Sequence, residues 1–515
     1  MPSLNWIGKE AVANHDKEVP FRLLKKIKGA SVGEDSQNLI IHGDNLEALK
    51  ALMPYYSGKI KCIYIDPPYN TGNEGWVYND KVNSPKIKQW LGKVVGRELE
   101  DLTRHDKWLC MMFPRLKLLR DLLTDDGAIF ISIDDNEHCN LKQVMDEIFS
   151  EINFVTNIIW QKKYTQSNDA KYFSNTHDFI LCYAKNKQSK DFKINLLART
   201  AEQDARYKNP DKDPRGPWMT QPLHAKSGTD KTYEFTFENG VKWKPPVGTF
   251  PRYSIETLKE ADKTGTIWFG KKGDAVPRLK KYLNEMKQGV IPKTIWLFDE
   301  VGSNDDAKKA VKNLFDDNPF DSPKPPSLIK QIIRLSSGSQ DIILDSFAGS
   351  GTTGHAVLDL NKEDGGNRKF IMVEMEDAVV KDITAERVKR AIKKYDYKGG
   401  FEYCELDKPL FNETGHIETT CDFNQFATYI YFTETQKNID KKEINGNFIG
   451  QDMGAEYYLI YKEPKKNDLD KSFLGKLRKS DNKKVVYADR CLLDDSQLSK
   501  YNLIFKQIPY EVKIY

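Results

Sequence analysis

The 515-residue sequence predicts an α/β fold built on a parallel sheet of the nucleotide-binding kind. Two hydrophobic strands carry this prediction, because each runs directly into residues suited to chemistry. Residues 60–65 end at Asp66-Pro67-Pro68-Tyr69, and residues 341–345 end at a glycine-rich turn. An apolar helix start and a third strand, residues 369–374, follow that turn. This order is typical of a sheet that binds a nucleotide at the carboxyl ends of its strands.

The chain opens with an expected N-terminal arm to about residue 38, which includes a basic amphipathic piece at residues 21–28. A strand at residues 39–44 follows and ends at Asp44. An acid at this position is suited to capping a helix that begins at Asn45. Asp44 is therefore expected as an N-cap, as a member of the site, or as both.

The tetrapeptide Asp66-Pro67-Pro68-Tyr69 holds the parts needed to bind a flat heterocycle with an exocyclic amine. The Asp66 carboxylate and the Pro67 carbonyl can each accept one N–H of that amine. The two prolines make a rigid turn, and Tyr69 can stack on the ring for about 1–3 kcal/mol. An ordinary strand-to-turn junction with two prolines is the alternative.

The next segments complete one half of the sheet. Residues 70–107 form a long polar loop with Trp76, Tyr78 and Trp90, of the length that is usually functional beside a catalytic edge. We expect a helix at 108–123, a strand at 128–133, and an antiparallel pair at 158–163 and 177–183. Asp134 and Asp135 are interpreted as solvated acids at a strand end, in preference to a metal site.

The second half of the sheet begins with a helix at residues 326–333 and continues into the glycine-rich turn. Glycines there let the backbone approach a cofactor, and the N-terminus of the following helix favours polar or anionic groups. Glu374 ends the next strand at the distance where such folds place an acid on ribose hydroxyls. The candidate cofactor-binding residues of the turn are Asp345, Phe347, Gly349, Gly351 and Thr352.

A charged helix is expected at residues 385–392, at the end of the second half of the sheet. From about Cys404 the sequence pattern becomes alternating and aromatic. Alternating aromatic stretches appear at residues 427–432 and 455–461, which indicates a separate mixed α/β module. A structural or subunit-contact role is expected for this module.

The two motifs now point to a family. Phe347-x-Gly349-x-Gly351 resembles the S-adenosylmethionine motif of amino-group DNA methyltransferases, and Asp66 to Tyr69 resembles their catalytic motif in the version typical of adenine-N6 enzymes. With the catalytic motif first, the chain resembles the beta class, a circularly permuted arrangement of the same Rossmann-like sheet. Longer stretches resemble the modification (Mod) subunits of type III restriction–modification systems, at residues 64–73, 129–137, 322–325 and 364–370.

The resemblance implies methyl transfer from S-adenosylmethionine to the N6 amine of a flipped adenine in double-stranded DNA. It implies that Asp66, Pro67, Pro68 and Tyr69 form the catalytic motif, and that Asp44 lies against the adenine amine of the cofactor. No metal is needed for this reaction. A homodimer and a separate helicase–nuclease (restriction) subunit are the protein partners that the resemblance implies.

Five regions follow from motifs and resemblance together. They are an N-terminal arm (1–38), the catalytic half of the methyltransferase domain (39–187), a target-recognition region (188–300), the cofactor-binding half (301–403) and the C-terminal module (404–515). The loop at residues 70–107 is expected to close over DNA.

Charge is concentrated in the middle of the chain, although the net charge is only +4. Residues 161–300 hold 26 Lys and Arg against 17 Asp and Glu, so the basic excess lies between the two motifs. Trp218, Trp243 and Trp268 lie in the same stretch. As a block these residues suit contacts with phosphates and base edges, whereas ordinary core packing is the alternative for each aromatic.

Composition indicates an intracellular enzyme of two to four domains, with 39% hydrophobic residues available for its cores. The seven cysteines are scattered without a Cys-x-x-Cys pair, so neither a zinc site nor a disulfide framework is expected. The N-terminus lacks an apolar signal core, and no stretch approaches the ~18 apolar residues of a membrane span. A cytoplasmic location is the default expectation.

Rival functions are weighed on the same residues. Cytosine-C5 methylation uses a nucleophilic cysteine that usually follows a proline, and no cysteine here does. Methyl transfer to cytosine N4, by enzymes whose motif usually begins with Ser, remains the main alternative reaction. A stand-alone (orphan or type II) enzyme and a non-catalytic DNA-binding regulator remain alternative roles for the protein. A complete restriction enzyme is disfavoured because no Gly-x4-Gly-Lys-Ser/Thr loop occurs, and Glu511-Val-Lys513 is interpreted as ordinary alternation.

Overall fold

The fold is known from a computed structural model, which describes residues 4–33, 36–71, 103–168, 170–228, 232–286, 289–412, 415–462 and 467–508. The aromatic residues expected in the loop after Tyr69 (Trp76, Tyr78 and Trp90) and Glu511 to Lys513 lie outside the described residues.

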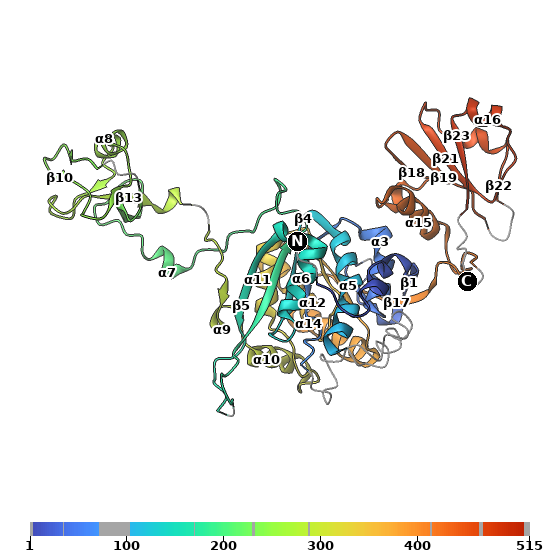
Figure 1. Cartoon of the computed structure of the whole chain (residues 1–515), viewed down its shortest axis with the longest axis horizontal. Helices are drawn as coiled ribbons and strands as arrows, with labels where there is room; N and C mark the ends of the chain where they lie inside the picture. The colour runs from blue at the N-terminus through green and yellow to red at the C-terminus, as the bar shows by residue number, and fades with distance from the viewer. Residues whose placement is uncertain are drawn as a thin grey trace. The chain divides into compact units, whose positions relative to one another are not determined.

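A parallel core of six strands within the described residues confirms the predicted α/β sheet. Its order is β17 (Glu402–Pro409), β2 (Leu39–His42), β16 (Lys369–Glu374), β15 (Ile342–Asp345), β3 (Ile60–Ile65) and β4 (Leu123–Ile133). β2, β3 and β4 come from the N-terminal half of the chain, and β15 and β16 from the second half, so the two motif-bearing halves form one sheet (Figure 1).

Flanking strands widen this core to a ten-stranded sheet within the described residues. On one side β6 (His177–Ala184) and β5 (Phe154–Gln161) form the predicted antiparallel pair, and β14 (Ile295–Trp296) runs parallel to β5. On the other side β1 (Arg22–Lys26) pairs antiparallel with β17. The basic piece of the expected N-terminal arm is thus an edge strand, and residue 404 lies inside a strand of the main sheet.

Helices of the first half pack on one face of the sheet. α3 (Asn45–Tyr56), α5 (Arg104–Leu122) and α6 (His138–Phe149) share a core with Ile63 and Ile65 of β3. Because side chains alternate along a strand, Cys62 and Tyr64 point to the opposite face. There α11 (Pro326–Ser336) contacts β3 and α12 (Thr352–Asp364), and α12 contacts α14 (Glu386–Tyr395).

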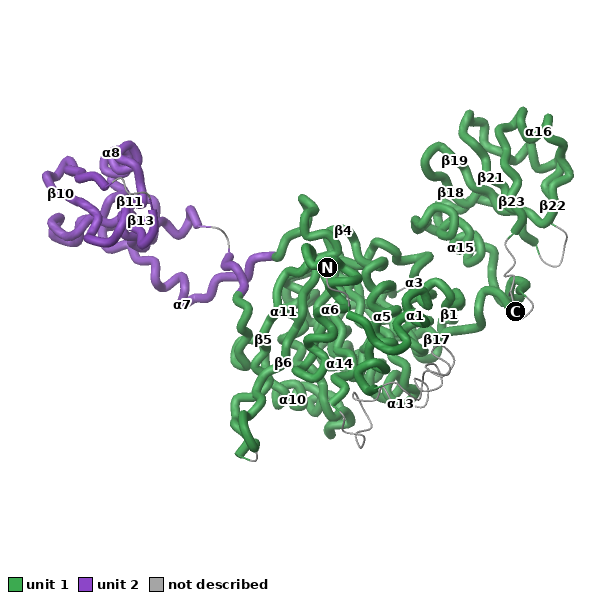
Figure 2. The backbone as a smooth tube through the Cα atoms, viewed as in Figure 1, with its two compact units in different colours: residues 1–194, 293–515 green, residues 195–292 purple. Residues whose placement is uncertain are grey.

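Residues 195–292 form a compact unit of their own (Figure 2, purple). Its sheet contains β7 (Trp218–Pro222), β13 (Arg278–Tyr282) and β12 (Ile267–Trp268), and helix α8 (Ile255–Lys263) supplies Leu258 to the core. Leu197 and Val290 exchange backbone hydrogen bonds of 2.9 Å, which closes the base of the unit. Short elements complete it: α7 (Ala201–Asp204), β8 (His224–Ala225), β9 (Phe235–Thr236), β10 (Lys242–Trp243) and β11 (Phe250–Pro251).

The C-terminal module is mixed α/β, as the sequence indicates. Its sheet contains β18 (Phe448–Asp452), β19 (Ala455–Leu459), β21 (Lys483–Ala488) and β23 (Leu503–Gln507). The alternating stretch 427–432 is not a strand, because it lies within α15 (Phe423–Thr435). Asp422 and Gln425 form a capping box that starts this helix, and its apolar side chains pack against the sheet.

The remaining described elements are α1 (Lys9–Val12), α2 (His15–Glu18), α9 (Phe298–Val301), α10 (Asn304–Phe315), α13 (Asp377–Val379), β20 (Asp468–Leu469), β22 (Arg490–Cys491) and α16 (Asp495–Lys500). Within the described ranges, no helix has both the length and the apolar character needed to cross a bilayer.

Candidate active site

The residues that the sequence singles out lie at one edge of the sheet. β2, β16, β15 and β3 are adjacent and parallel, so their carboxyl ends meet there. Asp345 and Glu374 end their strands, Asp66 follows β3 directly, and Asp44 follows β2 after one glycine. The structure therefore brings the two motifs together from opposite ends of the sequence.

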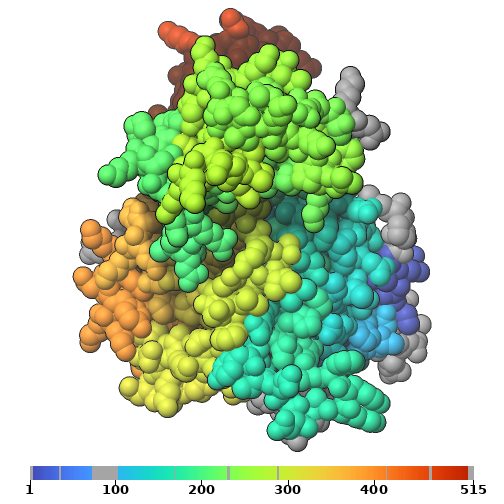
Figure 3. All heavy atoms as spheres, turned by 90° about the vertical axis from the view of Figure 1, so that its left-hand side faces the viewer, coloured from blue at the N-terminus to red at the C-terminus, as the bar shows by residue number. Residues whose placement is uncertain are grey.

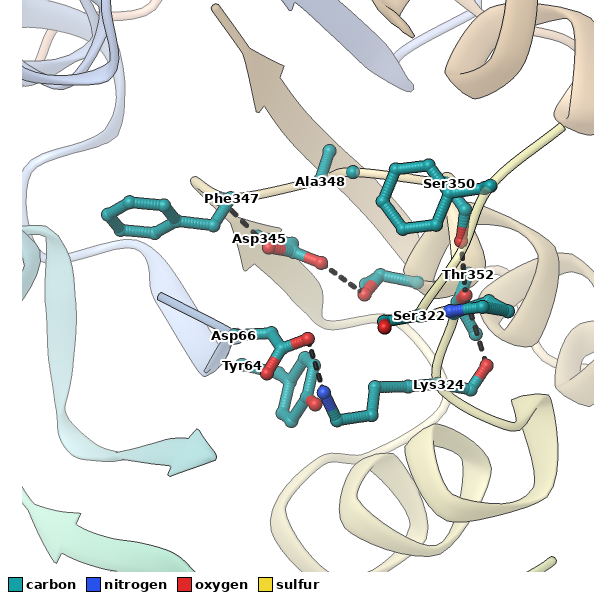
Figure 4. A pocket seen from close by; sticks show the side chains of 13 residues that line it. Tyr64, Asp66, Ser322, Lys324, Asp345, Phe347, Ala348, Ser350 and Thr352 are labelled. Carbon is teal, nitrogen blue, oxygen red and sulfur yellow. Dashed lines mark hydrogen bonds and ion pairs between the residues drawn. The ribbon is translucent and has the colours of Figure 1, made fainter. Parts of the chain in front are cut away.

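Asp66 is held by a lysine that the sequence analysis did not assign to the site. Its Oδ2 accepts a hydrogen bond of 2.5 Å from Lys324 Nζ, and the two side chains are only 14% and 10% exposed (Figure 4). Oδ1 is buried and has no hydrogen-bond partner in the described part of the chain. The Lys324 ammonium also lies 5.1 Å from the ring centroid of Tyr69. It thus occupies the space between carboxylate and ring where an amine-bearing base would bind.

The two proline carbonyls differ in their environment. The Pro68 carbonyl accepts a 2.7 Å hydrogen bond from the Trp108 indole, whereas the Pro67 carbonyl accepts none from the residues described. The next residue, Asn70, has φ 57° and donates to the fully buried carboxylate of Glu137. The turn is therefore fixed from both sides, and among the described residues the Pro67 carbonyl has no hydrogen-bond donor.

Burial shapes the ionisation of the tyrosine in this motif. Burial of the Tyr69 hydroxyl raises its pKa well above the ordinary value, and the nearby negative charge of Asp66 raises it further. The ring therefore remains a neutral phenol at physiological pH. This favours stacking on a base and argues against a role as a proton acceptor.

Asp345 organises the glycine-rich turn. Its Oδ1 accepts a 3.0 Å hydrogen bond from the Phe347 backbone N–H, and its Oδ2 accepts one of 2.5 Å from the Thr353 hydroxyl. Burial raises the pKa of this carboxyl to about 7. Gly351 has φ 74°, and a Cβ there would lie 2.8 Å from the Thr384 carbonyl oxygen, so glycine is required.

Glu374 ties the turn to the neighbouring strand. Its Oε2 accepts a 2.8 Å hydrogen bond from the Gly349 N–H, and its Oε1 accepts from the N–H groups of Met375 and Glu376 at 2.9 and 3.0 Å. Burial raises its pKa. These contacts establish a positioning role, and a contact with ribose stays a prediction.

Asp44 is a helix N-cap, which confirms one of its two expected roles. Its Oδ1 accepts hydrogen bonds from the backbone N–H groups of Leu46 and Glu47 at 2.9 and 3.2 Å. Its Oδ2 accepts one of 3.1 Å from the buried guanidinium of Arg115. The side chain is 26% exposed, so a ligand can still reach it. The contact with the cofactor stays a prediction.

A narrow pocket lies between the catalytic and cofactor motifs. The Lys324 carbonyl accepts a 3.2 Å hydrogen bond from the Thr352 hydroxyl, so residues 322–325 connect the two motifs. The ring of Phe320 lies 3.0 Å from the point where a Cβ of Gly349 would be. The pocket is lined by Tyr64, Asp66, Phe320, Ser322, Pro323, Lys324, Asp345, Phe347, Ala348, Gly349, Ser350, Thr352 and Thr353 (Figure 4).

Three residues of the site were missed by sequence reasoning. Lys324 stands between two prolines, a rigid setting that aims its side chain, and this was the available signal. Trp108 was placed on a helix, and the need of a buried indole for an acceptor would have pointed to a nearby carbonyl. Arg387 gave no local signal. It is fully buried on α14 and donates to Ser350 Oγ and Thr352 Oγ1, and burial lowers its pKa to about 10.

Several aromatic and basic candidates prove to be structural. Trp160 is fully buried and donates to the Gly302 carbonyl, and Trp218 and Trp243 are buried within the 195–292 unit. Lys280 belongs to the basic excess of residues 161–300, but its side chain is only 7% exposed. Its ammonium pairs with Asp211 and Asp213 at 2.6 and 2.8 Å, so this lysine is part of the internal packing of the unit.

Asp134 and Asp135 do not form a metal site in the structure. Asp134 accepts hydrogen bonds from the backbone and side chain of Asn136 at 2.9 and 2.8 Å. Among the residues whose placement is described, no group of three or more His, Cys, Asp or Glu side chains is arranged to hold a metal ion.

Comparison with known proteins gives a consistent result. The sequence profile of a family described as DNA methylase matches residues 60–386, which include both motifs. The chain is 40% identical to the type III restriction-modification enzyme StyLTI Mod subunit of Salmonella typhimurium, over 69% of this chain and 55% of that protein. It is 32% identical to the EcoP15I Mod subunit of Escherichia coli, over 84% and 75%. It is 30% identical to the type II methyltransferase M.KpnI of Klebsiella pneumoniae, over 73% and 87%.

Proposed function

The chain belongs to the DNA methylase family, and from this premise we propose that it transfers a methyl group from S-adenosylmethionine to the N6 amine of adenine in double-stranded DNA. One observation carries the proposal. The Asp66 carboxylate and the Tyr69 ring both lie beside the Lys324 ammonium, and Asp66 and Lys324 line a pocket together with residues of the glycine-rich turn.

The turn fits a nucleoside cofactor. Gly349 lines the pocket, and the left-handed φ values of Gly349 and Gly351, 47° and 74°, lead the turn into the N-terminus of α12. Phe347 lines the pocket and offers an aromatic face, while Glu374 and Asp44 supply carboxylates at the adjacent strand ends. These residues would hold the cofactor. When bound, it supplies a sulfonium methyl that is already activated for transfer.

The chain's own residues position the acceptor. An adenine amine entering the site would donate one N–H to the Asp66 carboxylate and one to the Pro67 carbonyl. It would displace the Lys324 ammonium, which holds the same carboxylate in the free protein. Tyr69 would stack on the base, and Trp108 would keep the turn rigid through Pro68. The adenine must first leave the helix, at a price of a few kcal/mol in lost pairing and stacking.

Adenine is favoured over cytosine because the motif begins with Asp66. Cytosine-N4 enzymes usually carry Ser at this position. Both bases present an exocyclic amine, so the two activities differ in the base that fits beside Tyr69. Analysis of the methylated nucleoside distinguishes them.

We further propose that the protein is the modification subunit of a type III restriction–modification system. The similarity to two type III Mod subunits supports this, although the matched region is 55% of the StyLTI subunit and 75% of the EcoP15I subunit. In this role it would form a homodimer and bind a separate helicase–nuclease subunit. A stand-alone type II methyltransferase is the second candidate, because the similarity to M.KpnI extends over 87% of that enzyme. Light scattering of the purified protein measures the dimer.

We propose that the unit of residues 195–292 selects the DNA sequence. It has its own core and is inserted between β6 and β14 of the sheet. The basic excess of residues 161–300 falls largely within it. Phosphate contacts from exposed lysines would orient the DNA, and a few side chains would read base edges.

A labelled-methyl transfer assay on genomic DNA, followed by sequencing of modified sites, tests the proposed activity. The native protein should methylate adenine, and Asp66→Ala should be inactive while cofactor affinity, measured by calorimetry, stays within about twofold. Asp134→Ala, at the same edge of the sheet but outside the motif, is the matched control, because the Asp134 carboxylate accepts its hydrogen bonds from Asn136. Near-native transfer by Asp66→Ala would remove Asp66 from its proposed role.

A further inference from the structure

The hairpin that joins β5 to β6 leaves the sheet at the catalytic edge. Ile65 pairs with Ile131, and Ile133 pairs with Phe179, so Asp66 and the hairpin of residues 162–176 lie at the same edge of the sheet, with β4 between β3 and β6. With strands about 4.8 Å apart, the base of the hairpin lies on the order of 10 Å from β3. Figure 1 shows the hairpin running past the end of the sheet below β5, and in Figure 3 it forms the lower edge of the molecule in teal.

The base of this hairpin is held firmly. Lys162 pairs with the buried Asp178 at 2.5 Å, and the Lys162 N–H donates to the Thr176 carbonyl at 2.9 Å. Asn175 donates to Asp135 Oδ2 at 3.3 Å, which ties the hairpin to the loop after β4. The antiparallel ladder of β5 and β6 continues beneath these contacts to Gln161 and His177. These contacts fix the base of the hairpin, so the side chains at its tip project from a rigid part of the sheet.

The tip carries two adjacent aromatic rings in water. Tyr172 is 81% exposed and Phe173 is 95% exposed. Burial of such a side chain is worth about 1.5–3 kcal/mol, so exposing two neighbours is unfavourable for the isolated protein. Lys171 lies with its ammonium 5.3 Å from the Tyr172 ring centroid, and Lys163 is also exposed. In DNA, an aromatic ring can stack on a base while a neighbouring lysine contacts a phosphate, so this combination of side chains suits DNA binding.

We propose that this tip is a DNA wedge, in which Phe173, supported by Tyr172, inserts into the target duplex beside the adenine that enters the active site. The inference rests on the proposed function, since it needs a flipped base. An apolar side chain between base steps lowers the free energy of the unstacked duplex and holds the gap open. Lys163 and Lys171 would contact the flanking phosphates. The wedge and the amine-binding motif would thus act on one nucleotide from the same edge of the sheet.

The test compares two duplexes that contain the methylated site identified by sequencing. In one the target adenine is paired with thymine, and in the other it faces an abasic position, where flipping requires little energy. Phe173→Ala should lower the single-turnover methylation rate on the paired duplex by about tenfold or more and leave the rate on the abasic duplex near native. Phe173→Trp should retain activity on both. Met453→Ala, which removes a 92% exposed side chain in the C-terminal module, is the control.

Base extrusion is measured directly with 2-aminopurine at the target position, whose fluorescence rises when the base leaves the stack. Phe173→Ala should reduce this rise on the paired duplex. Equal losses on both duplexes, or no loss on either, would overturn the wedge. A change from dimer to monomer in light scattering would also overturn it, because the tip would then bind a second copy of the chain. If the native protein methylates neither duplex, the proposed function fails instead.

Discussion

The ammonium group of Lys324 lies 2.5 Å from Asp66 Oδ2 and 5.1 Å from the centroid of the Tyr69 ring. These are the two groups that the proposed mechanism assigns to the adenine amine and to the adenine ring. In the proposed mechanism, Lys324 therefore keeps the largely buried Asp66 carboxylate paired until an adenine amine replaces it.

The first prediction concerns the ion pair between Lys324 and Asp66. Lys324→Met keeps the length of the side chain and removes its charge, so Asp66 loses its ion-pair partner. The single-turnover rate of methyl transfer should fall by about 10- to 100-fold, because the Asp66 carboxylate loses the contact that holds it in place before the base binds. Cofactor affinity should change little, because Thr352 contacts the backbone carbonyl of Lys324. Lys324→Arg should recover part of the rate.

Lys330→Met is the matched control for Lys324→Met. Lys330 pairs with Asp359 and Glu363 at 2.5 and 2.6 Å and does not line the pocket. Its substitution should leave the rate unchanged. A native rate in Lys324→Met would show that the ion pair has no part in the reaction.

A second prediction concerns the dependence of stability on pH. Burial raises the pKa of Asp345 to about 7 in the folded protein, well above that of an unfolded aspartate. The folded state therefore binds the proton more tightly, and the contribution of Asp345 is most favourable at low pH and is lost as pH rises from about 4 to about 7. Asp345→Asn resembles the protonated form. Its stability relative to the native protein should rise over this interval and level off above it.

Thermal unfolding of both proteins from pH 5 to pH 8.5 measures this difference. Asp134→Asn is the control, because in the described part of the chain the Asp134 carboxylate accepts hydrogen bonds from Asn136 alone. A constant difference between Asp345→Asn and the native protein across the range would show that Asp345 does not titrate there.

A third prediction separates backbone strain from packing at the glycine-rich turn. Gly351 and Gly365 flank α12 with φ 74° and 71°. An alanine at Gly365 would meet nothing within 4 Å, so Gly365→Ala should cost about 1–2 kcal/mol for the left-handed backbone alone. Gly351→Ala should lose a further ~1–3 kcal/mol, since its Cβ would collide with the Thr384 carbonyl. Urea unfolding measures both, and equal losses would contradict the clash.

A fourth prediction divides the lysines of the 195–292 unit by their burial. Lys271 and Lys272 are exposed, so their replacement by glutamine should weaken binding to all DNA sequences and reduce the salt slope by roughly two. Lys280→Met should instead destabilise the unit, because Asp211 and Asp213 would lose their shared cation. Binding isotherms at several salt concentrations and thermal unfolding distinguish the two outcomes. Stability lost in the first variant would reverse this assignment.

A fifth prediction is that sequence choice moves with residues 195–292. Exchange of this segment for the corresponding unit of a related enzyme, joined beside Leu197 and Val290, should redirect methylation to a new site and keep the chemistry. The joints suit the exchange because these two residues are hydrogen-bonded to each other. Genome-wide mapping of methylated adenines identifies the DNA sequence that the exchanged protein methylates. An unchanged target would assign recognition to another part of the chain.

The framework of the site was predictable because it depends on local patterns. Residues 60–65 and 369–374 are strands with the predicted bounds, and both are apolar runs that end in an acid. Lys324 and Arg387 were not assigned because their roles depend on tertiary contacts with Asp66 and Thr352, far away in the sequence. The helix at Phe423–Thr435 was missed since aromatic alternation outweighed the capping signal at Asp422.

The order of strands in the central sheet has a consequence for the protein during its synthesis. The neighbour of β3 on one side, β15, is encoded about 280 residues later, so at ~5–20 residues per second the ribosome needs on the order of 15–55 s to supply it. β2 remains unpaired for longer during synthesis, because both strands that pair with it, β16 and β17, come after β15 in the sequence. Throughout this time the apolar edge of the catalytic strand is open on the nascent chain. Translation speed and chaperone access should therefore determine the yield of folded protein more strongly than its final stability does.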